Sequence, residues 1–258
     1  MPLIDYTRRL WLIGGTTESA AIAAELSYHS HISCVVSVTT VWAQNLYPPS
    51  PNLQVWVGRL DSQQLEAFLC QQKITAVLDA SHPYATEISQ RAISITQKLQ
   101  IPYLRYERPA IDDASVINVD SFNTLLSGDY LHSHRVLLTV GYRTLPLFQS
   151  WQEKSTLFAR ILPSAIALET ALNSGFPNSR LICLRPPISL ELERSLWQQW
   201  QISLVVSKAS GAAGGEAVKR LVAQQLNIPL IVVARPVISY PQQTSDLATA
   251  LEFIQIHC

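Results

Sequence analysis

Short apolar runs with the character of buried strands alternate with stretches of helical periodicity along almost the whole chain. The runs are rich in Val and Ile and mostly continuous, whereas a strand with one face in solvent alternates apolar and polar residues. Parallel strands covered by helices on both faces have this continuous pattern. The predicted strands are Leu10–Ile13, Ile32–Val38, Leu53–Val57, Ala76–Leu78, Tyr103–Tyr106, Val136–Val140, Leu157–Leu162, Leu181–Leu184, Leu204–Val206 and Leu230–Val233.

The stretches between these runs predict helices, because their apolar residues recur three and four positions apart. Leu65, Phe68 and Leu69 show this spacing, and Asp61 and Ser164 are suited to cap the helices that follow them. The predicted helices are Glu18–Leu26, Ser62–Gln71, Ala85–Leu99, Pro163–Leu172, Leu190–Trp200 and Glu216–Leu226. The alternation indicates an α/β fold with doubly wound parallel sheets and right-handed crossovers.

The polar stretch 110–133 predicts a domain boundary. It contains Asp112-Asp113 and Ser127-Gly128-Asp129, and the predicted strands divide into comparable groups before and after it. We therefore expect two Rossmann-like domains that face each other across a cleft. The expected domains are residues 1–120 and 121–258.

Composition narrows the class of protein. Of 258 residues, 48% are hydrophobic and 15% are charged, which suits a chain with a large core and argues against disorder. The formal net charge is zero, so nothing indicates nucleic acid or an anionic membrane as a partner. The four cysteines show no metal-ligand spacing, so we expect no metal site and a reducing, cytoplasmic location. We also expect a monomer or small homo-oligomer. No apolar stretch reaches the roughly 18 residues of a membrane span.

The first glycine-rich turn is a candidate cofactor site. Gly14, Gly15, Thr16 and Thr17 follow a predicted strand and open a predicted helix. Backbone N–H groups in such a turn can bind a phosphate at the positive end of the helix. The turn is not GxGxxG, and a tight turn capped by Thr17 is the simpler structural interpretation.

The end of the next strand bears on the choice of cofactor. NAD sites carry an acidic residue there for the ribose 2′-OH. This chain has Ser37 and Thr39 in a segment without a carboxylate. Because hydroxyls can donate to a 2′-phosphate, a dinucleotide bound here is expected to be NADP(H).

Ser81 and His82 stand at the end of another predicted strand, where open α/β sheets bind ligands. We expect both to contact cofactor or substrate. His82 is also a candidate proton donor, since its unperturbed pKa lies near neutrality. The structural alternative is that Ser81 caps the following helix and His82 packs beside it.

Three groups of residues are candidates for binding acidic groups of a substrate. Arg105 and Arg108 lie near a strand end, although one could pair with Glu107. A second glycine turn, which contains Gly211, Gly214 and Gly215, follows another strand end, and it lacks the GK[ST] of a P-loop. The remaining candidates lie at strand ends or in this turn, within an apolar run in the case of Arg160, and on the helix after the turn in the case of Lys219: Thr139, Gly141, Arg160, Lys208, Ser210, Gly211 and Lys219.

Taken in order, these segments resemble the precorrin-6A reductase family of cobalamin biosynthesis over nearly the whole chain. The matching segments are Gly14-Gly15-Thr16-Thr17-Glu18, Asp79-Ala80-Ser81-His82-Pro83-Tyr84-Ala85, Pro102-Tyr103-Leu104-Arg105-Tyr106-Glu107-Arg108-Pro109, Leu138-Thr139-Val140-Gly141, Lys208-Ala209-Ser210-Gly211 with Lys219, and Ile228-Pro229-Leu230-Ile231-Val232-Val233-Ala234-Arg235-Pro236. Two places depart from the family pattern. The second glycine turn lacks the usual SGG start, and Tyr142-Arg143 stands where a lysine is common.

The resemblance implies an oxidoreductase that transfers hydride from NADPH to a macrocyclic tetrapyrrole and reduces its 18,19 double bond. The substrate is then precorrin-6A or cobalt-precorrin-6A, whose acetate and propionate arms need local positive charge. The first turn would hold NADPH, and the basic residues above would meet the side arms. Two other interpretations stay open: an NADP-dependent reductase of another small acidic substrate, and a non-catalytic nucleotide-binding regulatory module.

Overall fold

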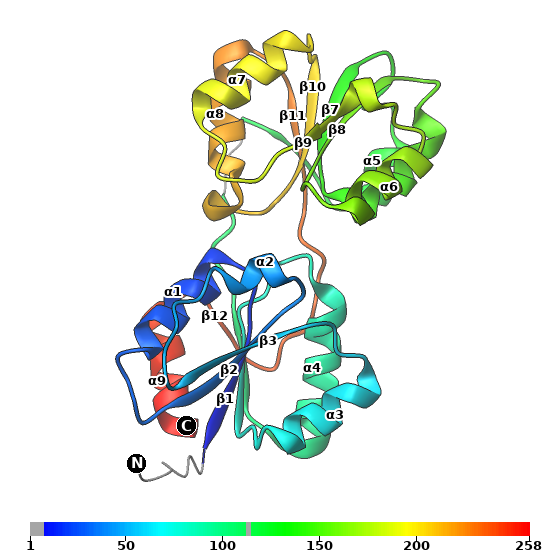
Figure 1. Cartoon of the computed structure of the whole chain (residues 1–258). Helices are drawn as coiled ribbons and strands as arrows, with labels where there is room; N and C mark the ends of the chain where they lie inside the picture. Colours follow the sequence, from blue (N-terminus) through cyan, green and yellow to red (C-terminus); the bar gives the residue numbers. More distant parts are fainter. Residues whose placement is uncertain (1–7, 112–114) are drawn as a thin grey trace. The chain divides into compact units, whose positions relative to one another are not determined.

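The computed structural model describes residues 8–111 and 115–258 and divides into two compact units (Figure 1). Unit 1 consists of Met1–Pro109 and Pro236–Cys258, and unit 2 of Ala110–Arg235. The expected division at residue 120 therefore needs correcting in two respects. The chain passes from unit 1 to unit 2 after Pro109, before residue 120. The C-terminal segment then returns to unit 1, where Ala250, Phe253 and Ile254 are buried in its core.

Unit 1 contains a six-stranded parallel sheet with the order β12-β5-β4-β1-β2-β3. The chain reverses its direction of winding between β1 and β4, which is the topological switch point where doubly wound sheets bind ligands. The strands are β1 Arg9–Ile13, β2 Ser33–Val38, β3 Leu53–Val57, β4 Ala76–Asp79, β5 Tyr103–Tyr106 and β12 Gln243–Thr244.

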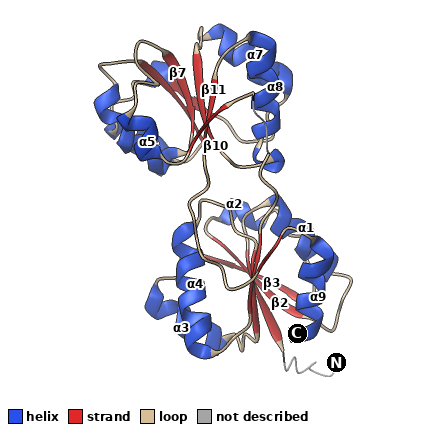
Figure 2. Cartoon of the chain, turned by 180° about the vertical axis from the view of Figure 1, so that it is seen from behind, coloured by secondary structure: helices blue, strands red, loops and turns tan. Residues whose placement is uncertain are grey.

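Helices cover both faces of this sheet (Figure 2). Leu10 and Leu12 of β1 pack with α1 and α9, whereas Trp11 and Ile13 pack with α3 and α4. Alternate residues of a strand point to opposite faces, so a continuous apolar run fills two cores. The helices are α1 Thr17–Leu26, α2 Val41–Gln44, α3 Ser62–Gln71, α4 Thr86–Leu99 and α9 Leu247–His257.

Unit 2 repeats the plan with the strand order β6-β11-β10-β7-β8-β9, again all parallel. Its switch point lies between β7 and β10. One edge strand of each sheet is out of sequence order. In unit 2 the edge strand β6 precedes the other five strands in the sequence, and in unit 1 the edge strand β12 comes after the whole of unit 2. The strands are β6 Ile117–Val119, β7 Arg135–Thr139, β8 Thr156–Ile161, β9 Leu181–Cys183, β10 Leu204–Lys208 and β11 Leu230–Val233.

The faces of the second sheet are also covered by different helices (Figure 1). One core contains Leu125, Phe148 and Ala167, and the other contains Trp197 and Val222. The helical elements are α5 Phe122–Ser127, η1 Tyr142–Trp151, α6 Ala165–Asn173, η2 Asn178–Arg180, α7 Leu190–Gln199, η3 Ala212–Gly214 and α8 Glu216–Leu226. The predicted α/β class with two Rossmann-like parallel sheets is confirmed. None of the described helices is long and apolar enough to cross a membrane.

Candidate functional site

Two loops meet at the switch point of unit 1, one after β1 and one after β4. The hydroxyl of Thr16 donates to the carbonyl of Ala80 at 2.7 Å and joins them. The structure thus brings together the glycine turn and the Ser81-His82 segment, which lie far apart in the sequence. Both loops leave the carboxyl ends of neighbouring parallel strands.

The glycine turn is tight on one side and open on the other. A Cβ on Gly14 would lie 2.3 Å from the hydroxyl of Tyr47, whereas one on Gly15 would meet nothing within 4 Å. Gly15 has φ +96°, a conformation that favours glycine. The open side leaves room for a ligand against the backbone, so this turn fits a dinucleotide.

Three N–H groups of the turn already have partners within the protein. Gly14 donates to the carbonyl of Ser37 at 2.9 Å, and Gly15 donates to the hydroxyl of Tyr47 at 2.7 Å. Thr16 donates to the hydroxyl of Ser19 and caps α1 in a capping box, so the interpretation of Thr17 as the N-cap was wrong. A phosphate would instead meet the N–H groups that begin α1, starting at Thr17.

The two hydroxyl residues at the end of β2 lie in different surroundings. Ser37 is 8% exposed, and its hydroxyl accepts a hydrogen bond from the indole of Trp11 at 2.9 Å. Ser37 therefore supports the core beneath the turn, and its contact with a cofactor stays a prediction. Thr39 is exposed, and the following residue Thr40 caps α2.

A buried ion-pair network lies beneath the loop that follows β4. Arg105 is 1% exposed, and its guanidinium donates to the carboxylate of Asp79 at 2.9 Å, to the hydroxyl of Ser81 at 3.1 Å and to the carboxylate of Glu107 at 2.9 Å. Tyr240 of the returning segment lies against this guanidinium. The expected contact of Arg105 with substrate is therefore replaced by a structural role that fixes Ser81.

His82 lies on the exposed side of the same loop. Its Nδ1 accepts a hydrogen bond from the backbone N–H of Tyr84 at 3.2 Å. In the neutral ring the proton is then carried by Nε2, which is a donor. His82 can thus donate one hydrogen bond or one proton from the carboxyl edge of the sheet.

Arg108 lies at the first turn of α1, where it pairs with Glu18 at 2.6 Å. Burial is the largest single influence and opposes ionisation of Glu18. The hydrogen bond from Arg108, the backbone hydrogen bond, the charge of Arg108 and the hydrogen bond from Thr17 together outweigh burial, so the pKa of Glu18 lies below its usual value. Arg108 was expected to contact substrate. The structure places it at the helix of the candidate cofactor turn, against a small hollow lined also by Ala80 and Ser81.

At the switch point of unit 2, cationic and aromatic side chains lie together. The ammonium of Lys208 lies 5.7 Å from the ring centre of Phe122. Burial and the positive charge of Arg143 lower the pKa of Lys208 to about 8. Gly141 has φ +80° and open space beside it, and Thr139 bonds to the carbonyl of Val206. This group suits a planar ligand that carries carboxylates.

The carboxylate of Glu216 accepts a backbone hydrogen bond from the second glycine turn. Gly211 donates its N–H to Glu216 at 2.7 Å, and Glu216 also pairs with Arg220. Ser210 donates to the carbonyl of Gly214. The turn was expected to bind the substrate's anionic groups, but Glu216 already accepts the N–H of Gly211.

Two further expected substrate residues also have internal partners. Lys219 is 3% exposed and donates to the carbonyl of Gly215 at 3.0 Å, and burial together with the charge of Arg160 lowers the pKa of Lys219 to about 8. Arg160 pairs with Glu193, which also accepts from the indole of Trp197. This pair explains a charge within an apolar strand.

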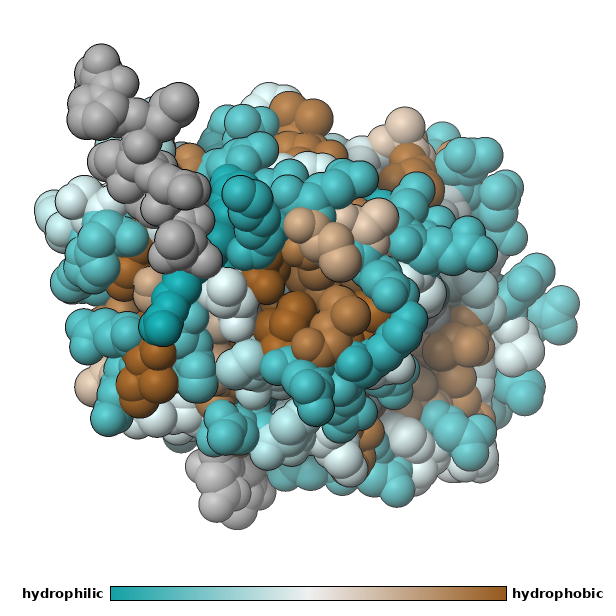
Figure 3. Space-filling model, turned by 90° about the horizontal axis from the view of Figure 1, so that it is seen from below, coloured by the Kyte–Doolittle hydropathy of each residue, from teal (hydrophilic) through white to brown (hydrophobic). Residues whose placement is uncertain are grey.

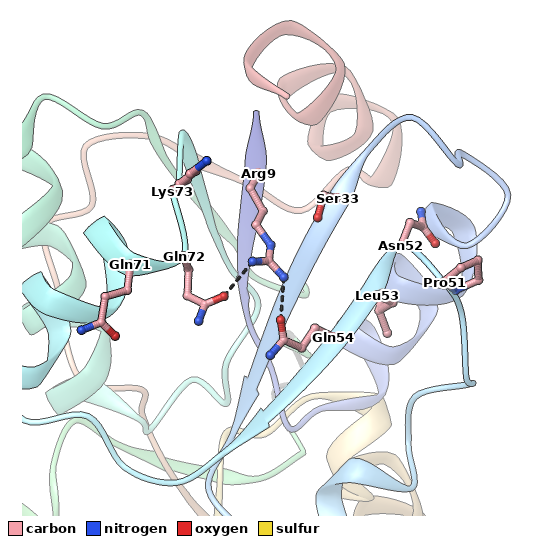
Figure 4. A pocket seen from close by; sticks show the side chains of 9 residues that line it. All are labelled: Arg9, Ser33, Pro51, Asn52, Leu53, Gln54, Gln71, Gln72 and Lys73. Atoms are coloured by element: carbon pink, nitrogen blue, oxygen red, sulfur yellow. Dashed lines mark hydrogen bonds between the residues drawn. The ribbon is translucent and has the colours of Figure 1, made fainter. Parts of the chain in front are cut away.

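A hollow of unit 1 lies at the opposite, amino ends of its strands (Figure 4). It has a volume of about 410 Å³, and Arg9 crosses it to bond Gln72 at 2.7 Å and Gln54 at 2.6 Å. Seen from this end, the surface has an apolar area surrounded by hydrophilic residues (Figure 3). Doubly wound sheets bind ligands at the carboxyl ends of their strands, so the switch points are the better candidate sites.

Three residues at these sites were not among the predicted site residues. Tyr47 and Glu216 accept hydrogen bonds from the N–H groups of the two glycine turns, and Asp79 forms an ion pair with Arg105. Asp79 directly precedes the Ser81 loop at a strand end, which was a usable signal. Tyr47 carried none, because it reaches the turn from a loop distant in the sequence.

Comparison with known proteins gives one consistent family. The family described as "Precorrin-6x reductase CbiJ/CobK" matches residues 9–255. A cobalt-precorrin-6A reductase of Synechocystis sp. is 45% identical over 99% of both chains. A cobalt-precorrin-6A reductase of Priestia megaterium is 29% identical and covers 89% of this chain and 91% of its own.

A more distant relative and a solved structure agree. A precorrin-6A reductase of Mycobacterium tuberculosis is 28% identical over 89% of this chain and 90% of its own. The solved structure titled "CobK precorrin-6A reductase" superposes with a TM-score of 0.79, covers 97% of both chains and is 22% identical. The superposition shows that the fold is shared.

Proposed function

Since the chain belongs to the precorrin-6x reductase family, an oxidoreductase family of cobalamin biosynthesis, we propose that it uses NADPH to reduce the 18,19 double bond of a precorrin-6A macrocycle. The observation that carries the substrate class is the 45% identity to a cobalt-precorrin-6A reductase over 99% of both chains. A relative named for the metal-free compound is only 28% identical. The cobalt form is therefore the favoured substrate, and metal-free precorrin-6A is the second candidate.

The proposed cofactor site is the switch point of unit 1. The open side of Gly15 and the N-terminus of the ten-residue helix α1 suit a pyrophosphate, and the exposed Thr39 at the end of β2 suits a 2′-phosphate. The bound nicotinamide supplies the hydride. Ser81 is held by Asp79 and Arg105, so the loop that carries His82 has a fixed shape beside the glycine turn.

The proposed contacts with the acidic side arms lie at the switch point of unit 2. Lys208 and Arg143 supply positive charge there, and Phe122 supplies an aromatic face. Thr139 and Gly141 line the same strand ends. The other expected residues, Arg160, Ser210, Gly211 and Lys219, hold the loops behind this surface through their internal partners.

His82 is the proposed donor on the cofactor side, because its neutral ring carries its proton on Nε2. It can hold the reacting end of a ligand by a hydrogen bond or deliver the proton that accompanies hydride transfer. The remaining contribution of the protein is to hold the bound cofactor and the bound substrate in a suitable orientation, because hydride transfer does not need a covalent intermediate with the protein.

The direct test incubates the purified chain with cobalt-precorrin-6A and NADPH and follows loss of the nicotinamide absorbance together with the spectrum of the macrocycle. We expect NADPH to be consumed in equal amount to macrocycle reduced. Metal-free precorrin-6A in a parallel reaction decides between the two candidate substrates. Absence of NADPH consumption with both would contradict the proposed function.

A further inference from the structure

Arg59 lies near the end of β2 although it follows the next strand, β3, in the sequence. Strand β3 runs parallel to β2 with Val57 opposite Val38, and the N–H of Gly58 donates to the carbonyl of Val38 at 2.8 Å. The residues that follow the two strands are therefore neighbours. Arg59 follows Gly58 and Thr39 follows Val38, so the register brings the backbones of these two residues close together.

Arg59 differs from two other arginines at strand ends in unit 1 in having no ion pair among the described residues. Arg105 and Arg108 both pair with carboxylates. The side chain of Arg59 is exposed and makes no hydrogen bond or ion pair within residues 8–111 and 115–258. The nearby carboxylate of Asp61 accepts the N–H groups of Gln63 and Gln64 at the start of α3. Arg59 is thus an exposed cation without an ion pair among the described residues, and it follows a strand at the carboxyl edge.

The surroundings of Arg59 suit a phosphate attached to a nucleoside. Residues 38–46 contain no acidic side chain, and Thr39 is exposed there. Trp42 is 67% exposed on the adjacent α2 and offers an aromatic face for a base. In this sheet order the pyrophosphate lies at the turn after β1 and the adenosine ribose at the end of β2.

Resting on the proposed function, we infer that Arg59, together with Thr39, binds the 2′-phosphate of the cofactor's adenosine and so makes the chain select NADPH over NADH. Neighbouring strands lie about 4.8 Å apart, which places Arg59 one strand from the ribose site and two from the pyrophosphate turn. A guanidinium is suited to a phosphate because its paired donors can bond two oxygens.

The test is direct binding rather than turnover. NADPH and NADH are titrated separately into the full chain, and nicotinamide fluorescence gives a Kd for each. Arg59→Gln is expected to raise the Kd for NADPH by about ten- to a hundredfold, the factor that charge-assisted bonds of this strength imply. The Kd for NADH is expected to stay within about twofold, because NADH lacks the phosphate.

Two variants sharpen the result. Lys73→Gln removes one positive charge at the opposite, amino end of the same sheet (Figure 4) and is expected to leave both Kd values unchanged. Arg59→Lys keeps the charge and is expected to recover part of the NADPH affinity. Equal weakening of NADPH and NADH by Arg59→Gln, or no weakening of NADPH, would overturn the inference.

Failure of this inference is distinguishable from failure of the proposed reaction. A wild-type chain that binds NADPH tightly yet reduces neither tetrapyrrole would contradict the reaction while the Arg59 comparison could still be made. A chain that reduces the macrocycle with NADPH and NADH equally well would contradict the role of Arg59 and leave the reaction standing.

Discussion

The guanidinium of Arg105 lies 2.9 Å from the carboxylate of Asp79, and the two side chains are 1% and 0% exposed. The second oxygen of Asp79 accepts from the hydroxyls of Ser89 at 2.6 Å and Tyr103 at 2.7 Å. Burial and then the neighbouring Asp79 charge raise the pKa of Tyr103 well above its usual value, which keeps its hydroxyl a donor. A buried charge of this kind is stable only when opposite charges and hydrogen bonds compensate the loss of its hydration.

The first prediction is that Asp79→Asn destabilises unit 1 by about 3–5 kcal/mol, because it leaves Arg105 buried with reduced compensation. The chain has two compact units, for which one global melting curve is not a two-state measurement, so the stability of unit 1 is measured by hydrogen exchange of the β4 and β5 amides. The matched control is Lys98→Gln, which breaks an exposed pair with Glu66 and is expected to cost under about 1 kcal/mol. Equal effects of the two variants would contradict the structural role.

This network also shows where prediction from sequence stops. Arg105 was predicted to meet substrate because arginines at strand ends often bind carboxylates. The sequence did show Glu107 as a possible partner for a neighbouring arginine. It did not show Asp79, because only the pairing of β4 with β5 brings the two residues together. Residue type and place at a strand end were predictable, whereas the partner that neutralises the charge was not.

The fold itself was largely predictable for a physical reason. A strand buried on both faces must be apolar throughout, so most strands of both sheets stand out as Val- and Ile-rich runs. The exceptions are β6 and β12, whose sequences Ile117–Val119 and Gln243–Thr244 are short edge segments. Missing β12 and α9 hid the return of the chain to unit 1.

The second prediction concerns the tight side of the first glycine turn. Gly14→Ala would place a Cβ 2.3 Å from the hydroxyl of Tyr47 and 2.8 Å from Val36, and we expect overpacking to cost about 1–3 kcal/mol. In a Tyr47→Phe background the closest of these contacts disappears, so the added cost of Gly14→Ala should be smaller. Hydrogen exchange of the β1 and β2 amides in the wild type, the two single variants and the double variant measures this coupling. Strictly additive effects would mean that the two residues do not meet.

The third prediction tests what the end of β2 contributes to cofactor choice. Thr39→Asp puts a carboxylate where NAD-binding sheets have one. It should repel the 2′-phosphate of NADPH and accept a hydrogen bond from the 2′-OH of NADH. We expect the Kd for NADPH to rise at least about tenfold and that for NADH to fall, both measured by nicotinamide fluorescence. Thr39→Val removes the hydroxyl without adding charge and should weaken NADPH only slightly.

The fourth prediction assigns Lys208 to the tetrapyrrole rather than to the cofactor. Lys208→Met removes the cation beside Phe122 and should weaken binding of the macrocycle about tenfold or more, while the Kd for NADPH stays within about twofold. Absorbance titration of the macrocycle and fluorescence titration of NADPH measure the two affinities. A larger loss for NADPH would reassign Lys208 to the cofactor.

The titration of Lys208 gives the same prediction a pH dependence whose sign is fixed. Burial and Arg143 lower the pKa of Lys208 to about 8, and the charged form is the protonated one. In the free protein its charge is therefore nearly complete about one pH unit below that pKa, half lost at the pKa, and lost above it. Bound carboxylates favour the ammonium, which moves the decline in the complex to a somewhat higher pH than in the free protein. Lys208→Arg keeps its charge throughout this range. Macrocycle affinity should therefore fall between about pH 8 and 10 in the wild type and stay nearly level in Lys208→Arg, whereas parallel pH profiles would show that another group controls binding.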